Sequence, residues 1–146
     1  MIRPLDRNSD RERSRWGELR IALFPDLDPA FNDADMAALL ARDEQEVLLA
    51  FSGDEVVGFA EVALRNLVDG CLTSPVGYLE GIYLVPGHRG KGLSRQLLEA
   101  AMGWARAQGC SEFASDSSLD ETEAQAWHRR VGFEETYRIV QFRREL

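Results

Sequence analysis

A glycine-rich segment, residues 86–94, separates an apolar stretch from the clearest helical pattern in the chain. The stretch Val76–Leu84 ends at Val85-Pro86, and from Leu93 apolar residues recur at helical spacing until Gly109. A turn of small residues that opens a helix exposes backbone amides at the positive end of the helix dipole. Taken alone, the segment predicts either a phosphate-binding loop or a simple tight turn.

Short strands and helices are predicted along the rest of the chain, and the second half alternates between the two. A polar loop, residues 66–75, precedes the strand Val76–Leu84. We expect further strands at Ile2–Leu5, Val47–Phe51, Val56–Leu64, Glu112–Ser115 and Phe133–Phe142, and further helices from Ser9 or Asp10 to Leu23, from Asn32-Asp33 to before Arg42, and from Glu121 to Arg130.

Length and composition indicate one globular domain, residues 1–146. No apolar run is long enough to cross a membrane, and the N-terminus does not resemble a secretory signal, so we expect a cytoplasmic protein. The formal net charge of −8 argues against a nucleic-acid partner and suits a cationic substrate. Cys71 and Cys110 have no metal-site or disulfide spacing, and we expect no metal.

Residues 89–94, Arg-Gly-Lys-Gly-Leu-Ser, resemble the Arg/Gln-x-x-Gly-x-Gly/Ala signature of the GNAT acyltransferase superfamily, with Ser94 in place of the last small residue. The order of predicted elements and the string Val131-Gly132-Phe133 are also similar to that family. The resemblance implies an α+β fold of the α/β/α type. It implies about four helices and a central mixed, mostly antiparallel twisted sheet of about six to seven strands, whose fourth strand is splayed.

The same resemblance implies acetyl-CoA as the co-substrate. Its pantetheine arm would lie along the splayed fourth strand, and the amide near Ile82 would polarise the thioester carbonyl. Its pyrophosphate would lie on the amides of the glycine-rich segment. The residues implied in cofactor binding are Ile82, Tyr83, Leu84, Arg89, Gly90, Lys91, Gly92, Leu93 and Ser94.

Two carboxylates are candidates for the proton chemistry of an amine acceptor. Glu80 interrupts an otherwise apolar strand, which favours a carboxylate facing a polar cavity; the alternative is an edge or solvent-facing glutamate. Asp116 follows a predicted strand at its carboxyl end, where open sheets build sites, or it shapes the turn before the next helix. Either carboxylate can accept the proton that an ammonium must lose before attack.

His128 stands four residues before Gly132, where many GNAT members have a tyrosine that protonates the leaving thiolate. Histidine can donate a proton near neutral pH. The alternative is a helix histidine that only packs near the cofactor. Glu121 stands where the superfamily often has a cofactor-contacting asparagine.

Several strings resemble the aminoglycoside 6'-N-acetyltransferases more closely, including Trp-Gly-Glu-Leu-Arg at residues 16–20 and Tyr-Leu-Glu-Gly-Ile-Tyr at residues 78–83. The resemblance implies a homodimer whose last strands help close the acceptor cleft. Phe24 stands in place of a tryptophan, and Tyr137 in place of a glutamate. The residues implied in substrate binding are Phe24, Tyr78, Glu80, Asp116 and Tyr137.

Other functions remain open at this level. An acetyltransferase could act on another small polyamine or on a peptide amine. A non-catalytic acyl-CoA-binding domain would keep the same fold. A plain α+β domain would have a glycine-rich turn that binds no ligand.

Overall fold

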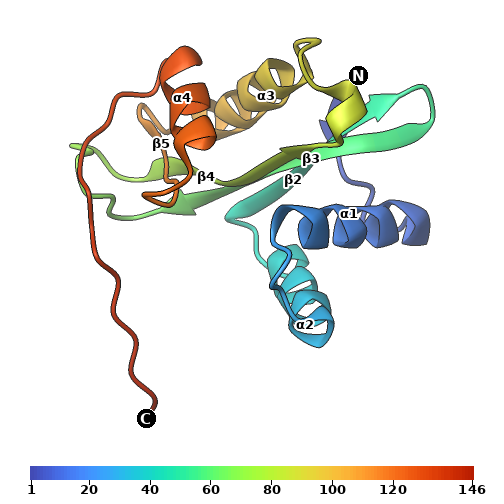
Figure 1. Ribbon diagram of the computed structural model, residues 1–146, viewed down its shortest axis with the longest axis horizontal. Coiled ribbons are helices and arrows are strands. Elements are labelled where there is room, and N and C mark those ends of the chain that lie inside the picture. The colour runs from blue at the N-terminus through green and yellow to red at the C-terminus, as the bar shows by residue number, and fades with distance from the viewer.

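The computed structural model describes all residues, 1–146, and has three layers (Figure 1). A central sheet is covered on one face by helices α1 and α2 and on the other by α3 and α4. The elements in chain order are β1 (Ile2–Pro4), α1 (Asp10–Leu23), α2 (Pro29–Leu40), β2 (Gln45–Ser52), β3 (Glu55–Arg65), β4 (Val76–Leu84), a 3₁₀ turn (Pro86–His88), α3 (Leu93–Ala107), β5 (Phe113–Ser115) and α4 (Thr122–Arg130).

The sheet is mixed and mostly antiparallel, as the sequence predicts, but it has five strands rather than six or seven. The strands lie in the order β1-β2-β3-β4-β5, and only the pair β4–β5 is parallel. The predicted final strand Phe133–Phe142 is absent: Phe133 packs against Phe113 and Thr136 lies beside Gly70, but the chain then leaves the body of the molecule, and no part of the segment has a neighbouring strand. A strand without a neighbour has no partners for its backbone hydrogen bonds.

Side-chain caps decide where the first two helices begin. The hydroxyl of Ser9 accepts a hydrogen bond from the Glu12 amide at 3.2 Å, which confirms the predicted start of α1. Helix α2 begins at Pro29, earlier than the predicted start near Asn32. The Asp28 carboxylate accepts a hydrogen bond from the Phe31 amide at 3.0 Å, so Asp28 caps the helix with a proline at its first position.

Two apolar clusters fill the spaces between the layers. Leu97 and Leu98 of α3 pack with Leu79 of β4 on one face of the sheet. Trp16 of α1 packs with Phe59 of β3 on the other face. Successive residues of a strand point to opposite faces, so the strands supply both clusters. The sheet is therefore anchored on both sides.

Strand β4 changes its pairing in the middle. On the β3 side, Val62 lies opposite Leu79 and Glu61 lies opposite Gly81, which leaves Glu80 as the extra residue of a bulge. On the other side, β5 pairs only with Gly77–Leu79. The second half of β4, residues 80–84, therefore has no strand partner on the β5 side.

Candidate active site

Tyr78 and Asp116 form a direct contact where β5 ends. The phenolic hydroxyl of Tyr78, a buried residue of β4, donates a hydrogen bond to Oδ2 of Asp116 at 2.5 Å. Asp116 follows the last residue of β5 and is exposed. Burial, followed by the hydrogen bond to Asp116, raises the pKa of the Tyr78 hydroxyl above its ordinary value. Tyr78 therefore stays a donor, and one oxygen of Asp116 is fixed while the carboxylate remains open to solvent.

Arg65, the last residue of β3, compensates the charge of Glu80. Its Nε and Nη2 atoms donate hydrogen bonds to the two oxygens of Glu80 at 3.0 and 2.8 Å. The guanidinium carbon of Arg65 also lies 3.4 Å from the centre of the Tyr78 ring. Glu80 and Asp116 are thus brought to one region, but only Glu80 is held in an ion pair.

Arg65 is a site residue that the sequence alone does not predict. Pairing of β3 with β4 places Ala63 opposite Tyr78, so Arg65, two residues further along, projects from the same face as Tyr78. Had the register been predicted, it would have placed a cation beside both carboxylates.

His128 and Ser115 form a second polar pair, between β5 and α4. Oγ of Ser115 lies 2.8 Å from Nε2 of His128, and Nδ1 of His128 lies 2.6 Å from the carbonyl oxygen of Ala124. Because a carbonyl only accepts hydrogen bonds, Nδ1 carries a hydrogen. The Ser115 hydroxyl also lies within hydrogen-bond reach of the carbonyl oxygen of Leu79, at 3.3 Å. The helix histidine is therefore held in a defined orientation against the end of β5.

The two polar pairs lie on opposite faces of the sheet. Leu79 points into the cluster that contacts α3, so its neighbour Tyr78 points to the opposite face. Asp116 contacts Tyr78, whereas Ser115 contacts His128 of α4, on the α3 side. Two consecutive residues at the end of β5 therefore carry their polar side chains to different sides.

The glycine-rich segment leaves the start of α3 open. Gly90 and Gly92 adopt positive φ angles of 76° and 86°, and a Cβ atom at either position would meet nothing within 4 Å. Gly92 is the N-cap residue, and no side chain caps the helix. Nε of Arg89 donates to the carbonyl oxygen of Leu84 at 2.9 Å, which ties the segment to the end of β4. The first-turn amides of α3 are accessible to an anion.

Some of the remaining predicted residues lie in the folded part of the chain, and one lies in the C-terminal segment, residues 134–146. Leu84 is buried, while Ile82 and Tyr83 are half-buried on the part of β4 without a β5 partner. Phe24 is 42% exposed and lies near Gly81 of the same strand. Tyr137 is 66% exposed on the segment that leaves the body of the molecule (Figure 1), so the chain does not pack it beside Tyr78 or Asp116.

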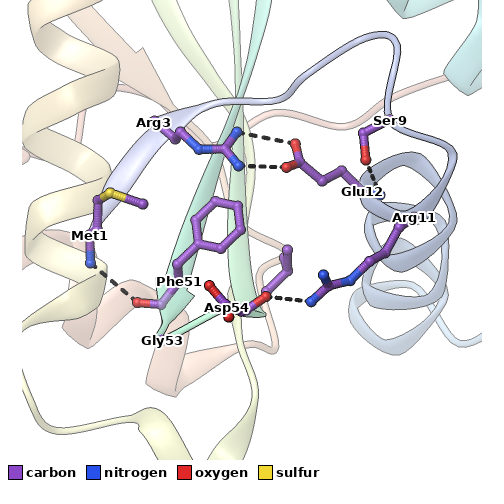
Figure 2. A pocket seen from close by; sticks show the side chains of 9 residues that line it. Met1, Arg3, Ser9, Arg11, Glu12, Phe51, Gly53 and Asp54 are labelled. Atoms are coloured by element: carbon purple, nitrogen blue, oxygen red, sulfur yellow. Dashed lines mark hydrogen bonds and ion pairs between the residues drawn. The ribbon is translucent and has the colours of Figure 1, made fainter.

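A separate pocket of about 160 Å³ lies between β1, α1 and the turn that joins β2 to β3 (Figure 2). Its two arginines and Glu12 already have partners within the chain. Arg3 contacts the Glu12 carboxylate with two nitrogens, and Arg11 donates to the carbonyl oxygen of Asp54 at 2.5 Å. None of its lining residues belongs to the segments that carry Asp116, Ser115 or the glycine-rich loop.

Comparison with known proteins assigns this arrangement to a family. The model of the acetyltransferase (GNAT) family matches residues 14–133, which include the bulged strand, the glycine-rich segment and both polar pairs. The chain belongs to the GNAT acetyltransferase family.

Relatives of this GNAT acetyltransferase match along nearly the whole chain. It is 46% identical over 137 residues to aminoglycoside N(6')-acetyltransferase type 1 of Stenotrophomonas maltophilia, covering 92% of this chain and 88% of the relative. The structure of AAC(6')-Iy in complex with the bisubstrate analogue CoA-S-monomethyl-acetylneamine is 34% identical, covers 100% and 98% of the two chains, and superposes with a TM-score of 0.91. That of AAC(6')-Ig from Acinetobacter haemolyticus is 38% identical, covers 100% and 99%, and has a TM-score of 0.92.

The residues of this GNAT acetyltransferase fit an acyl-CoA. An uncapped helix start behind two glycines suits a pyrophosphate, and Lys91 and Arg89 add positive charge. The half of β4 without a β5 partner offers backbone groups to an extended ligand. No group of three or more His, Cys, Asp or Glu side chains is arranged to hold a metal ion. None of the helices combines the length and apolar character needed to span a membrane.

Proposed function

We propose that this protein transfers the acetyl group of acetyl-CoA to the 6'-amine of an aminoglycoside. The observation that carries the proposal is the similarity, along nearly the whole chain, to relatives named aminoglycoside N(6')-acetyltransferase type 1, two of which are 46% and 40% identical. Membership of the GNAT family supports acetyl transfer. The formal net charge of −8 supports a polycationic acceptor, which a negative protein attracts.

Asp116 is our candidate for the general base. An amine attacks a carbonyl only in its neutral form, so an ammonium must first lose a proton. Tyr78 engages Oδ2 of Asp116, while no side chain of the protein forms an ion pair with this carboxylate. The free oxygen Oδ1 can therefore bind the ammonium and accept its proton.

Glu80 is the second carboxylate of the proposed site. It is the extra residue of the β4 bulge, and Arg65 binds both of its oxygens. We assign Glu80 to orienting the acceptor and to assisting the proton transfer, directly or through a water molecule. Phe24, near Gly81, and the ring of Tyr78 would provide the apolar part of the acceptor site.

The co-substrate would be held largely by the backbone. In this assignment the amides of residues 89–94 bind the pyrophosphate, with charge from Arg89 and Lys91. The edge of β4 at Ile82, Tyr83 and Leu84 binds the pantetheine arm, because these residues lack a neighbour on the β5 side. Acetyl-CoA supplies an acetyl group activated as a thioester.

His128 is our candidate for the proton donor to the leaving thiolate. It lies on α4, across the sheet from Asp116, with Nδ1 bound to the Ala124 carbonyl and Nε2 directed at Ser115. A donor on the face opposite the base would serve the sulfur atom while the base serves the nitrogen atom. The alternative is that His128 only packs against Phe133 and Trp127.

We further propose that the protein is a homodimer in the cytoplasm. The C-terminal segment supports a dimer, because it exposes Tyr137, Ile139, Val140 and Phe142 and has no strand partner within its own chain. In a dimer this segment would bring Tyr137 to the acceptor cleft. The free thiols of Cys71 and Cys110 support a reducing compartment.

An acetylation screen tests the proposed function. Acetyl-CoA is offered with aminoglycosides that have or lack a 6'-amine, with linear polyamines and with short peptides, and released CoA thiol is followed. We expect turnover only with 6'-amino aminoglycosides, and NMR of the product should locate the new amide at the 6' position. Turnover of polyamines or peptides alone would contradict the proposal.

Two variants connect this test to the site. Asp116→Asn and Glu80→Gln keep the size of each side chain but remove its charge. Each should lower acetylation by about 100-fold, the usual contribution of a general base, while acetyl-CoA affinity stays unchanged. Unchanged turnover in both variants would exclude the two carboxylates from the reaction.

A further inference from the structure

We propose that Ser115 is a further catalytic residue, which passes a proton from His128 to the sulfur atom of the leaving CoA thiolate. The proposal rests on the proposed acetyl transfer and adds a residue to it. It starts from the hydrogen-bonded chain formed by Ala124, His128, Ser115 and Leu79.

The chain of hydrogen bonds fits two protonation states of His128. In the neutral ring, Nδ1 donates to the Ala124 carbonyl and Nε2 accepts the hydrogen of Ser115 at 2.8 Å. In the charged ring, Nε2 donates to Ser115, and the hydroxyl can turn toward the Leu79 carbonyl at 3.3 Å. Neither state breaks the bond to Ala124, so a proton can move between His128 and Ser115 without rearranging the helix.

The position of Ser115 is suited to a leaving group. Ser115 is the last residue of β5 and pairs with Leu79, the last residue of β4 that has a β5 partner. Beyond this pair the edge of β4 is free, and the proposed path of pantetheine begins there. The Ser115 hydroxyl thus lies at the point where an extended acyl-CoA would end, and Nε2 of His128 lies 2.8 Å from it.

The proton and electron balance of the step is complete. The neutral amine nitrogen forms a bond to the acetyl carbon, and the carbon–sulfur bond breaks with its electron pair going to sulfur. The Ser115 hydroxyl gives its proton to this thiolate and takes one from Nε2 of charged His128. The acceptor ammonium first loses one proton, which Asp116 passes to solvent, and the nitrogen loses a second proton to Asp116 as the amide forms. After the reaction Asp116 releases its proton to solvent and His128 takes one up from solvent. The products are the amide and the CoA thiol.

The competing interpretation is a structural serine that only joins β5 to α4. Replacing Ser115 with alanine removes the hydroxyl, whereas threonine keeps it, so the pair of variants separates hydroxyl chemistry from packing. Ser118 offers a matched control, because it is exposed in the following loop and only its carbonyl oxygen accepts hydrogen bonds.

Kinetics with neamine and acetyl-CoA give the first test. Ser115→Ala should lower kcat and the single-turnover rate by about 100-fold, the usual contribution of a positioned proton donor, with the Kd of acetyl-CoA unchanged. Ser115→Thr should restore most of the rate, and Ser118→Ala should match the wild type. A wild-type rate in Ser115→Ala overturns the proposal, as does a loss that Ser115→Thr shares.

A double variant tests whether the two residues act as one unit. If the proton passes from His128 through Ser115, His128→Gln and Ser115→Ala lower the single-turnover rate by similar factors. The double variant should then be no slower than the slower single variant. Independent, multiplying losses would overturn the relay.

A spectroscopic test requires no acceptor at all. The chain contains only two histidines, His88 and His128, so ¹⁵N spectra of labelled protein with bound acetyl-CoA are readily assigned by a His88→Gln variant. Ser115→Ala should change the Nε2 resonance of His128 and leave that of His88 in place, and an unchanged His128 resonance overturns the pair. If neamine is not acetylated by the wild type, the proposed function fails, whereas this spectrum still decides whether Ser115 and His128 are hydrogen-bonded.

Discussion

The hydroxyl of Tyr78 donates to Oδ2 of Asp116 across 2.5 Å, while the guanidinium of Arg65 lies 3.4 Å from the ring centre of the same tyrosine. A buried ring is thereby held between a cation on its face and a carboxylate at its hydroxyl. The contact orients Asp116 from within β4. It also helps to raise the pKa of the tyrosine hydroxyl, which a titration can measure.

Tyr78 should ionise at a lower pH in an Asp116→Asn variant than in the wild type. The pKa of Tyr78 is raised by burial and then by Asp116, which accepts its hydrogen bond and repels a phenolate. Asparagine removes the charge. An ultraviolet titration of each protein, with the Tyr78→Phe spectrum subtracted, isolates this residue, and coincident curves would contradict the contact.

The raised pKa of Tyr78 also predicts a direction for stability at alkaline pH. The unfolded chain ionises this tyrosine near its ordinary value of about 10, whereas the folded protein keeps it protonated. The stability that Tyr78 contributes is complete below that pH and is lost as the pH rises toward the folded value. Urea unfolding across this range should show a steeper fall for the wild type than for Tyr78→Phe.

The buried pair of Glu61 and Arg20 should matter more to stability than the exposed ion pairs. Nε of Arg20 lies 2.7 Å from Oε1 of Glu61, which also accepts a hydrogen bond from Nε1 of Trp16 at 2.9 Å. Burial raises the pKa of the Glu61 carboxyl despite the nearby arginine. Arg20→Met would leave this acid without its cation, and we expect a loss of about 3 kcal/mol in the free energy of unfolding.

A second substitution provides the control for the buried pair. Replacing Glu61 with leucine in the Arg20→Met background removes the uncompensated acid, so much of the lost stability should return. Arg15→Met, which breaks the surface pair with Glu18, should cost under about 1 kcal/mol. Equal losses from Arg20→Met and Arg15→Met in urea unfolding would contradict the assignment.

Arg89→Glu should weaken acetyl-CoA binding, because it places a negative charge beside the amides at the start of α3. We expect about a tenfold rise in the Kd, measured by calorimetry, since about 1.4 kcal/mol corresponds to that factor. Arg106→Glu reverses a charge at the far end of the same helix and serves as the control. Equal affinities in the two variants would argue against binding of pyrophosphate at this loop.

Deleting residues 134–146 should produce a monomer if the exposed C-terminal segment makes the proposed dimer. Sedimentation of the full chain and of the shortened chain at equal concentration gives the measurement. A quadruple variant that replaces Tyr137, Ile139, Val140 and Phe142 with serine keeps the length of the segment and should also be monomeric. A monomeric full chain would rule out the dimer.

Much of the fold follows from patterns of local sequence. The continuous apolar runs of β2 and β3 predict strands that are buried on both faces, and the helical spacing from Leu93 predicts a helix with one buried face. The start of α2 was missed because its cap, Asp28, lies before a proline in a stretch that looks like a turn. The predicted strand Phe133–Phe142 failed for a different reason, since strand formation depends on a neighbour and not on composition.

The glycine-rich loop of the site could be predicted from the sequence, whereas Arg65 and Ser115 could not. Gly90 and Gly92 have the positive φ angles that a glycine-rich turn requires, so a local signal found them. Arg65 and Ser115 carry no local signal. Arg65 meets Glu80 and Tyr78 through the register of β3 with β4, and Ser115 meets His128 through the packing of α4 on β5. Such contacts emerge only from tertiary structure.

Ser115 and Asp116 are neighbours in the chain, yet they contact groups on opposite sides of the sheet. In the proposed reaction, Asp116 accepts a proton from the amine on one side of the sheet, and the adjacent Ser115 donates a proton to the thiolate on the other side. A one-residue deletion in the loop before β5 would shift this strand along β4 and exchange the two sides. Such a deletion would turn the Asp116 carboxylate toward α4 and the Ser115 hydroxyl toward Tyr78, so it should abolish turnover while leaving the glycine-rich loop intact.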